Sequence, residues 1–368
     1  MIQTEHAPAE SAESLFQEGL NFSQLGDYES AIGYFDQAIT RKPDFYEALS
    51  EKGSVLISLG QHEAAVSCFE RAIVHHPDSP DLHYSRGWAA YVAKDFETAI
   101  ASFNQLVTLQ SNYPNAYYSQ GLTLFALKRY EEAISQFSKA LEQTPKFPDA
   151  WCMQGVALYA THRYEGAVTH FNQSLELRPD YQDALINRGH ALLCLGDFEA
   201  AISSYEKALA IDAEDADVWF YRGLAFKQLN RHEAAIESYQ KVLELQPNHA
   251  ATWYNQACSC MKLGDNEDAI AQFDQAVQLN PNYYEAWYNR GVVLKTVGRL
   301  EDAIASYDRA LALKPTDFRA WNNRGSILVS LKRFAVAVAS YDQVLALKPD
   351  DAIALQNRTV ALRNTKLA

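Results

Sequence analysis

The chain has 368 residues, 48% of them hydrophobic, and a formal net charge of -14. This charge argues against a nucleic-acid-binding surface, which needs clustered Lys and Arg, and against binding to an anionic membrane surface. The five cysteines are odd in number and scattered through helical patterns, which indicates reduced thiols rather than a disulfide framework.

The chain begins with a polar, acidic segment, MIQTEHAPAES, which lacks the basic start and apolar centre of a signal peptide. The longest apolar stretches, such as WAAYVA at 88–93, are far shorter than the roughly 18 residues that a membrane-spanning helix needs. We therefore expect a soluble, cytoplasmic protein without membrane insertion, and a short N-terminal tail at 1–11.

A unit of 34 residues recurs ten times without insertion between residues 12 and 351. A fixed period in this range is the signature of a repeat array. Such an array grows by stacking units rather than by closing a single core, so chain length does not set the number of domains. The units are 12–45, 46–79, 80–113, 114–147, 148–181, 182–215, 216–249, 250–283, 284–317 and 318–351.

Three positions of the unit, numbered 1 to 34, predict a helix hairpin. Position 8 is Gly in nine copies and Ala257 in the other, position 20 is always Ala, and position 24 is always Phe or Tyr. Small residues at 8 and 20 allow two helices to approach closely, and the ring at 24 fills the space beside them.

Other positions predict where the two helices end. Position 15 is Gly, Asn230, Lys or His, which suits a residue with positive φ after the first helix. Position 18 is Glu in nine copies, where it meets the dipole of the second helix favourably. Pro at position 32 ends the second helix, and Pro80, Pro114 and Pro148 are predicted to open the next first helix.

The joint pattern W/L-x3-G-x2-L/Y, then A-x3-F/Y, then P resembles that of the tetratricopeptide repeat (TPR) family over residues 12–351, in the style of bacterial, including cyanobacterial, members. The resemblance implies an all-α solenoid in which antiparallel helix pairs stack into a right-handed superhelix. The first helices would line the concave face and the second helices the outside. The tail at 352–368 restarts a first helix with Leu355, Val360 and Leu362, and we expect it to cap the array.

The resemblance also implies that ligands are held by positions 2, 5, 6, 9, 12 and 13 of the first helices. In repeats 3 to 5 these positions are apolar and aromatic, which is typical of an interaction surface. The alternative is that the rings pack against neighbouring repeats. The residues are Tyr84, Trp88, Tyr91, Val92, Tyr118, Leu122, Phe125, Cys152, Val156 and Tyr159.

Repeats 7 to 10 are more polar and locally basic at the same positions. Asn at position 6 can hydrogen-bond the backbone of an extended peptide, as in the similar asparagine ladder of the TPR arm of O-linked glycosyltransferases. The alternative is that Asn is common here without that role. The residues are Asn187, Asn255, Asn289, Asn323 and Asn357, with Phe220, Lys227, Tyr254, Met261, Lys262, Tyr288, Lys295 and Arg319 beside them.

Arg recurs at position 7, and its regularity predicts a scaffold role in which the head pairs with acids of an adjacent repeat. The copies are Arg86, Arg188, Arg222, Arg290, Arg324 and Arg358. The carboxylate clamp of chaperone-binding members is not expected, because position 5 has no Lys, position 9 has no Asn and position 6 has no Arg.

No phosphate-binding loop, dinucleotide fingerprint or nucleophile elbow appears. Cys258 and Cys260 are two apart on a helix and therefore point in different directions, and no carboxylate accompanies the pair His190 and Cys194. We expect neither enzymatic activity nor a cofactor or metal.

The sequence therefore favours a non-enzymatic scaffold, adaptor or assembly factor that captures a peptide or protein segment in a concave groove. The analogy is with bacterial members that assist assembly of membrane complexes such as photosystems. One alternative is a self-associating scaffold, a homo-oligomer joined through its ends or through the outer surface at Ala335 and Val336 of repeat 10, unless that surface contacts the capping helix. Another is a carrier of a small apolar molecule or lipid in the aromatic surface of repeats 3 to 5.

Overall fold

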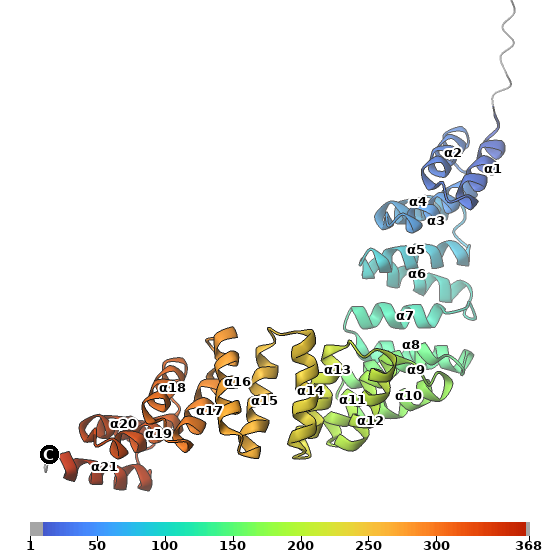
Figure 1. Ribbon diagram of the computed structural model, residues 1–368. Helices are drawn as coiled ribbons and strands as arrows, with labels where there is room; N and C mark the ends of the chain where they lie inside the picture. Colours follow the sequence, from blue (N-terminus) through green and yellow to red (C-terminus); the bar gives the residue numbers. More distant parts are fainter. Residues whose placement is uncertain (1–9, 366–368) are drawn as a thin grey trace, which may run out of the picture. The chain divides into compact units, whose positions relative to one another are not determined.

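The computed structural model describes residues 10–365, and these residues form 21 α-helices and no strand (Figure 1). The predicted all-α solenoid of antiparallel helix pairs is confirmed. Residues 1–9 of the expected N-terminal tail and 366–368 of the expected cap lie outside the described part. The described chain forms two compact units, 10–187 and 188–365, and α11 (Gln182–Leu195) contains the boundary.

The helices alternate between the first and the second helix of each repeat. Those of the N-terminal unit are α1 (Ala12–Gln24), α2 (Tyr28–Arg41), α3 (Tyr46–Ser58), α4 (His62–His75), α5 (Pro80–Val92), α6 (Phe96–Leu109), α7 (Ala116–Ala126), α8 (Tyr130–Gln143), α9 (Pro148–Ala160) and α10 (Tyr164–Leu177). After α11 the C-terminal unit contains α12 (Phe198–Ile211), α13 (Ala216–Gln228), α14 (His232–Leu245), α15 (Ala250–Leu263), α16 (Asn266–Leu279), α17 (Tyr284–Thr296), α18 (Leu300–Leu313), α19 (Phe318–Ser330), α20 (Phe334–Leu347) and α21 (Ala352–Thr365).

Each hairpin closes where the position-24 ring lies against the position-8 glycine. A Cβ atom added to Gly155 would lie 2.7 Å from the ring of Phe171, closer than packed atoms allow. The alanines at position 20 and the position-24 rings, such as Ala167 and Phe171, are fully buried. The prediction that small residues permit close helix approach is therefore confirmed.

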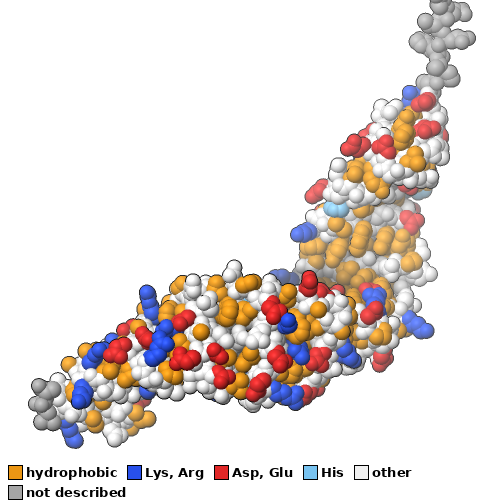
Figure 2. All heavy atoms as spheres, in the orientation of Figure 1, with side chains coloured by type: hydrophobic (Ala, Val, Ile, Leu, Met, Phe, Trp, Pro, Cys, Tyr) orange, Lys and Arg blue, Asp and Glu red, His pale blue; other side chains and the backbone are white. Residues whose placement is uncertain are grey.

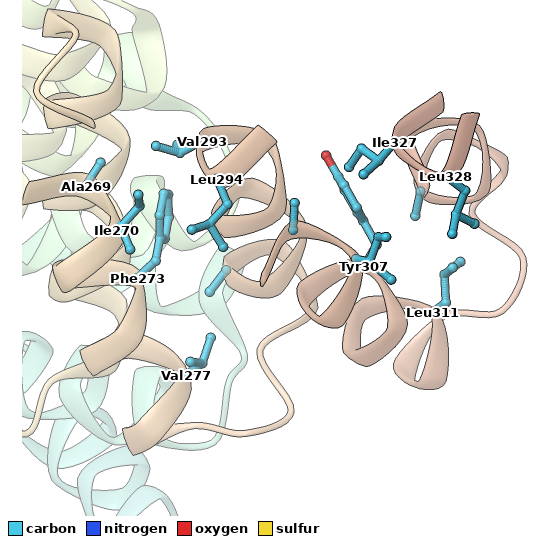
Figure 3. Close-up of a cluster of buried hydrophobic side chains, with 14 of the residues drawn as sticks. Ala269, Ile270, Phe273, Val277, Val293, Leu294, Tyr307, Leu311, Ile327 and Leu328 are labelled. Carbon is cyan, nitrogen blue, oxygen red and sulfur yellow. The ribbon is translucent and has the colours of Figure 1, made fainter. Parts of the chain in front are cut away.

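The cores of successive repeats join by stacking, as Figure 3 shows for repeats 8 to 10. Phe273 of α16 lies against Leu294 of α17, and Tyr307 of α18 lies against Ile327 of α19. Because the ring of one second helix is covered by the next first helix, each repeat needs a neighbour to bury its apolar face.

The residue at position 15 has positive φ in all ten repeats, as predicted. The five glycines have φ between 73° and 89°, and the non-glycine residues have φ between 57° and 64°. These non-glycine residues are Lys94, Lys128, His162, Asn230 and Lys332.

The prediction for Pro114 is wrong. Pro80 and Pro148 are the first residues of α5 and α9, but α7 begins two residues after Pro114, at Ala116. Asn115 lies before it with φ 60°, and the Ala116 amide donates to the Tyr113 carbonyl at 3.2 Å. Asn adopts the left-handed conformation more readily than most residues, so a turn replaces the first turn of the helix.

Four of the six position-7 arginines pair with a carboxylate of the preceding repeat, as the scaffold interpretation predicted: Arg222, Arg290, Arg324 and Arg358. Arg290 donates to Ser306 of its own repeat at 2.6 Å and to Asp274 of the preceding repeat at 2.5 Å. Arg324 makes the equivalent contacts with Ser340 and Asp308. The guanidinium therefore ties three helices together.

Repeats 4 and 5 make the same link with neutral groups. Gln120 donates to Asn104 at 2.7 Å, and Gln154 donates to Ser138 at 2.7 Å. Gln at position 7 thus faces a neutral residue at position 25 of the preceding repeat, whereas Arg290 and Arg324 face carboxylates. This matched exchange indicates that the two positions act as a pair.

Tryptophans at position 4 fasten first helices to the preceding turn. Each indole N–H donates to the backbone carbonyl six residues earlier, at 2.9–3.0 Å. The five are Trp151, Trp219, Trp253, Trp287 and Trp321. Trp88 is the sixth tryptophan of the chain and occupies position 9 instead.

Ion pairs also run along the second-helix side. Arg163 pairs with Glu131 at 2.9 Å and Arg333 with Glu301 at 3.2 Å, from position 16 to position 18 of the preceding repeat. Repeat 10 has no carboxylate for such a pair, because its position 18 is Ala335. These pairs are solvent-exposed, so each contributes little stability.

The helix expected at the C-terminal end is present as α21, which packs on α20 and α19. Its buried residues are Ala354 and Ala361, whereas Leu355 and Val360 are 47% and 42% exposed. Two of the three apolar residues expected to cover the last repeat therefore remain at the surface, because no helix that follows α21 within residues 10–365 covers its other side.

Candidate interaction surface on the first helices

The first helices form the closely spaced layer of each unit. Successive first helices touch one another, from α1 to α9 and from α13 to α21. Among the described residues, no two successive second helices contact each other in this way. The first helices therefore line the inner side of each unit, where the resemblance placed the ligand.

Positions 9 and 12 form a diagonal row across this inner surface. Within α5, Trp88 stacks on Tyr91 with ring centroids 5.5 Å apart. From one repeat to the next, Lys295 at position 12 reaches Ser326 at position 9, with Nζ 3.4 Å from Oγ. Successive members of the row are therefore neighbours.

In repeats 3 to 5 every member of this row is apolar. Trp88 is 37% exposed, and the other five side chains are partly exposed. Figure 2 shows hydrophobic side chains gathered over this part of the N-terminal unit. We call the row the apolar stripe; it consists of Trp88, Tyr91, Leu122, Phe125, Val156 and Tyr159.

Aromatic rings of the second helices pack against the position-12 residues of the stripe. Tyr91 packs on Phe96 at 5.8 Å, and Phe125 packs on Tyr130 at 5.2 Å between ring centroids. One side of each ring is thereby held, which lowers the entropy lost when a partner covers the other side.

Tyr84 and Tyr118, also expected to bind a partner, pack within their own repeats. Tyr84 lies 5.2 Å from Tyr113, and Tyr118 lies 4.7 Å from Phe147, between ring centroids. Burial raises the pKa of Tyr118 to about 12. Both rings are therefore partly buried against the last residue of their own repeats.

In the C-terminal unit, the asparagines at position 6 bond to the preceding repeat. The Asn289 amide donates to the Tyr254 hydroxyl at 3.2 Å, and the Asn323 amide donates to the Tyr288 hydroxyl at 3.2 Å. The Oδ1 atoms of Asn289 and Asn323 accept no hydrogen bond from residues 10–365. They can therefore accept from a bound backbone.

Asn255 differs from its two successors. Its side chain is 9% exposed, its amide donates to the Ala251 carbonyl at 2.8 Å, and its Oδ1 accepts from Lys227 at 2.8 Å. Both the nitrogen and the oxygen of this carboxamide are hydrogen-bonded within the protein. Asn255 therefore holds its neighbours in place and has no equivalent acceptor left for a bound peptide.

Three lysines on the inner surface lack a carboxylate partner within the described part of the chain: Lys227, Lys262 and Lys295. Lys262 is exposed. By contrast, Arg319 pairs with the buried Asp317 at 3.0 Å. The lysines therefore carry positive charge that is free to meet an anionic group.

Asp317 has the most perturbed carboxyl group on this surface. Burial alone would raise its pKa, but hydrogen bonds from Arg319 and Tyr284 outweigh burial and lower the pKa to about 2. Asp317 is therefore a fixed anion that holds the first turn of α19.

Several hollows lie between repeats, each lined by residues of a first helix and of second helices. One, of about 690 Å³, is lined by residues of α2, α3 and α4, including Lys52 and Cys68. Two smaller ones, of about 330 and 300 Å³, lie beside Gln256 and Gln154, where other repeats have Arg at position 7. The sequence could have indicated these two through the loss of the arginine head.

The histidine that lies four residues before Cys194 packs against an aromatic ring. His190 lies against Tyr221 at 4.4 Å between ring centroids, and burial lowers its pKa. Between residues 10 and 365, no three His, Cys, Asp or Glu side chains are placed to hold a metal ion. No helix in the same range is both long and apolar enough to cross a membrane.

Comparison with known proteins agrees with this geometry. A family model described as tetratricopeptide repeat matches residues 16–66, 51–117, 118–182, 186–250, 254–317 and 294–352. No curated protein sequence matches the chain.

Several solved structures share the architecture. The C-terminal part of a TPR repeat-containing protein from Cytophaga hutchinsonii is 20% identical, with a TM-score of 0.58, covering 65% of this chain and 98% of that one. A tetratricopeptide repeat protein from Parabacteroides merdae is 20% identical, with a TM-score of 0.51, covering 67% and 98%. YrrB, described as a TPR protein with an unusual peptide-binding site, is 23% identical, with a TM-score of 0.46, covering 50% and 95%. At these identities the likeness shows the fold alone.

Proposed function

The chain belongs to the tetratricopeptide repeat family, and from this premise we propose that it is a non-enzymatic adaptor or assembly factor that binds peptide or protein segments on its first helices. The observation that carries the proposal is the apolar stripe. Six apolar side chains in a continuous row stay partly exposed on the inner surface of three repeats. Contiguous exposed apolar surface on a folded protein usually marks an interaction site.

The C-terminal unit supports the proposal with different chemistry. The free Oδ1 atoms of Asn289 and Asn323 suit the N–H groups of an extended backbone. Carboxylates on the same segment suit the three lysines that form no ion pair within residues 10–365, namely Lys227, Lys262 and Lys295. We propose that this unit binds an extended, acidic segment.

The proposed compartment is the cytoplasm. Within residues 10–365, none of the five cysteines forms a disulfide, and four of them are buried. Cysteines without disulfides in this number are typical of a reducing compartment.

The test is affinity purification with crosslinking mass spectrometry. We expect crosslinks to a partner to concentrate on the first helices, and to be lost in the double variant Trp88→Ala, Leu122→Ala. The matched control is Val74→Ala, Leu177→Ala, which removes two exposed apolar side chains from the second helices α4 and α10. Crosslinks confined to the second helices would contradict the proposal.

Self-association is a second candidate, because α21 exposes Ile353, Leu355 and Val360 at 66%, 47% and 42%. Light scattering over a concentration series tests it. A mass that rises with concentration in the wild type and stays monomeric in Leu355→Ser, Val360→Ser would support it, and a monomer throughout would exclude it. Native mass spectrometry tests the carrier alternative, which requires retained mass from a small apolar molecule.

A further inference from the structure

The two units differ in the charge of their ligand-facing positions. In repeats 1 to 5, positions 2, 5, 6, 9, 12 and 13 of the first helices carry no Lys or Arg. They carry five carboxylates, on Glu13, Glu47, Glu51, Asp81 and Asp149. At these positions of repeats 1 to 5, the formal charges are therefore all negative.

Some of these carboxylates already have partners. Asp149 pairs with Arg178 at 2.9 Å, and Asp81 accepts from Tyr113 at 2.7 Å. Glu47 and Glu51 on α3 form no ion pair with any residue between 10 and 365. The helix α3, which carries these two negative charges, contacts α5, which carries Trp88.

The stripe also lacks groups that would bind an extended backbone. Position 6 in repeats 3 to 5 is Ser85, Ser119 or Met153, and Ser119 is only 3% exposed. A strand-like peptide would leave N–H and C=O groups unpaired against these apolar side chains, which is costly. An α-helix satisfies its own backbone and needs only an apolar face from its partner.

We propose that the apolar stripe of the N-terminal unit binds an amphipathic α-helix whose apolar face is bordered by Lys or Arg. Trp88 and Leu122 contact the apolar face, and Glu47 and Glu51 meet the cationic border. This inference rests on the proposed function and names the partner chemistry for one of its two surfaces.

The test uses synthetic helices and the full-length chain. The probe is a peptide of about 18 residues with Leu on one face and Lys on the other, long enough to form a helix when bound. A second peptide has Glu in place of every Lys, and a third keeps Lys but has Pro at its centre. The readout is Trp88 emission, taken as the difference between wild type and Trp88→Phe, because the other five tryptophans occupy position 4.

We expect the Leu/Lys peptide to shift Trp88 emission to the blue and to bind at least about tenfold more tightly than the Leu/Glu peptide at low salt. The difference should shrink as NaCl rises from about 50 mM to about 500 mM, because salt screens exposed charges. The Pro peptide should bind at least about tenfold more weakly than the unbroken one, since Pro interrupts the helix.

Variants separate the two parts of the surface. Glu47→Gln, Glu51→Gln should weaken the Leu/Lys peptide about threefold to tenfold and leave the Leu/Glu peptide no weaker. The control Glu63→Gln, Glu97→Gln removes two exposed carboxylates from α4 and α6 and should change binding by less than about twofold. Leu122→Ala should weaken the Leu/Lys peptide about tenfold, with an unchanged circular dichroism spectrum.

Equal binding of the Leu/Lys and Leu/Glu peptides would overturn the charge assignment and leave the proposed function standing. Equal binding of the Pro peptide would overturn the helical assignment. Absence of binding by every peptide, together with partner crosslinks on first helices, would overturn this inference alone. Partner crosslinks confined to second helices would instead remove the proposed function.

Discussion

The carboxamide of Asn289 donates to the phenol oxygen of Tyr254, one repeat earlier, at 3.2 Å. Position 6, which the sequence predicted to bind a peptide, therefore also links successive repeats. The two roles are compatible because the amide N–H serves the scaffold, and Oδ1 stays available to a partner. The asparagine row of the C-terminal unit thus has a defined orientation before a ligand arrives.

Removing the Tyr254 hydroxyl, which accepts the hydrogen bond from Asn289, should lower the stability of the fold. We expect Tyr254→Phe to lower the free energy of unfolding by about 1 kcal/mol, because the Asn289 amide loses a partly buried partner. Urea denaturation measures the change. In a double-mutant cycle with Asn289→Ala, we expect a coupling energy of about 0.5–1 kcal/mol. Strict additivity would show that the bond contributes nothing.

The charged pair at positions 7 and 25 should be replaceable by the neutral pair that other repeats have there. Arg324→Gln leaves the Asp308 carboxylate and the buried Ser340 without their donor, so we expect it to lower the free energy of unfolding by about 1 kcal/mol. Adding Asp308→Asn recreates the Gln120–Asn104 pair found in the N-terminal unit. The double variant should recover at least half of the loss. A double variant less stable than Arg324→Gln would contradict the interpretation of these positions as a pair.

Glycine at position 15 should stabilise repeats that lack it. Lys128 has φ 60°, a conformation that costs a residue with a Cβ atom about 1 kcal/mol. We expect Lys128→Gly to raise the free energy of unfolding by about 0.5 kcal/mol, after the greater chain entropy of Gly is subtracted. The control is Lys207→Gly on the exposed side of α12, which should lower stability by about 1 kcal/mol. Equal losses at both sites would contradict the prediction.

The position-8 glycines should not tolerate alanine. In Gly155→Ala the new methyl group would lie 2.7 Å from the Phe171 ring, and we expect a loss of about 1–3 kcal/mol as the hairpin opens. Gly33 in α2 has open space where its Cβ atom would lie. Gly33→Ala should therefore gain up to about 1 kcal/mol from helix propensity. Thermal or urea unfolding distinguishes the two signs.

Asp317 should make stability depend on pH in the acidic range. Burial raises its pKa, but hydrogen bonds from Arg319 and Tyr284 dominate and hold it at about 2, below the ordinary 3.8. A lowered pKa contributes stability above the unfolded pKa, and this stability is lost as pH falls from about 4 to about 2. The contribution near neutral pH is on the order of 2 kcal/mol. Asp317→Asn should remove this contribution, so the free energy of unfolding should fall less between pH 4 and pH 2 than it does in the wild type. An equal fall in both proteins would contradict the assignment.

The sequence by itself determined the hairpin and its stacking. Gly155, Ala167 and Phe171 recur at fixed spacing because the same close approach recurs in every repeat, and local sterics allow few substitutes. The same reasoning identified the residues with positive φ, since Gly and Asn favour that conformation wherever it occurs. The Arg290 link was also readable, because an unmatched charge on a packed helix needs a partner.

Tertiary packing alone decided which inner residues face outward. Tyr84 and Trp88 are both aromatic residues on one helix, but Tyr84 packs on Tyr113, whereas Trp88 stacks on Tyr91 and stays 37% exposed. Likewise, Asn255 is occupied at both ends and Asn289 at one, because only Asn255 has a lysine beside its oxygen. Such differences depend on which side chains pack together, often from residues far apart in the sequence, and the identity of a single residue does not determine them. Tertiary packing therefore separated the six residues of the apolar stripe from the other inner residues that the sequence had grouped with them.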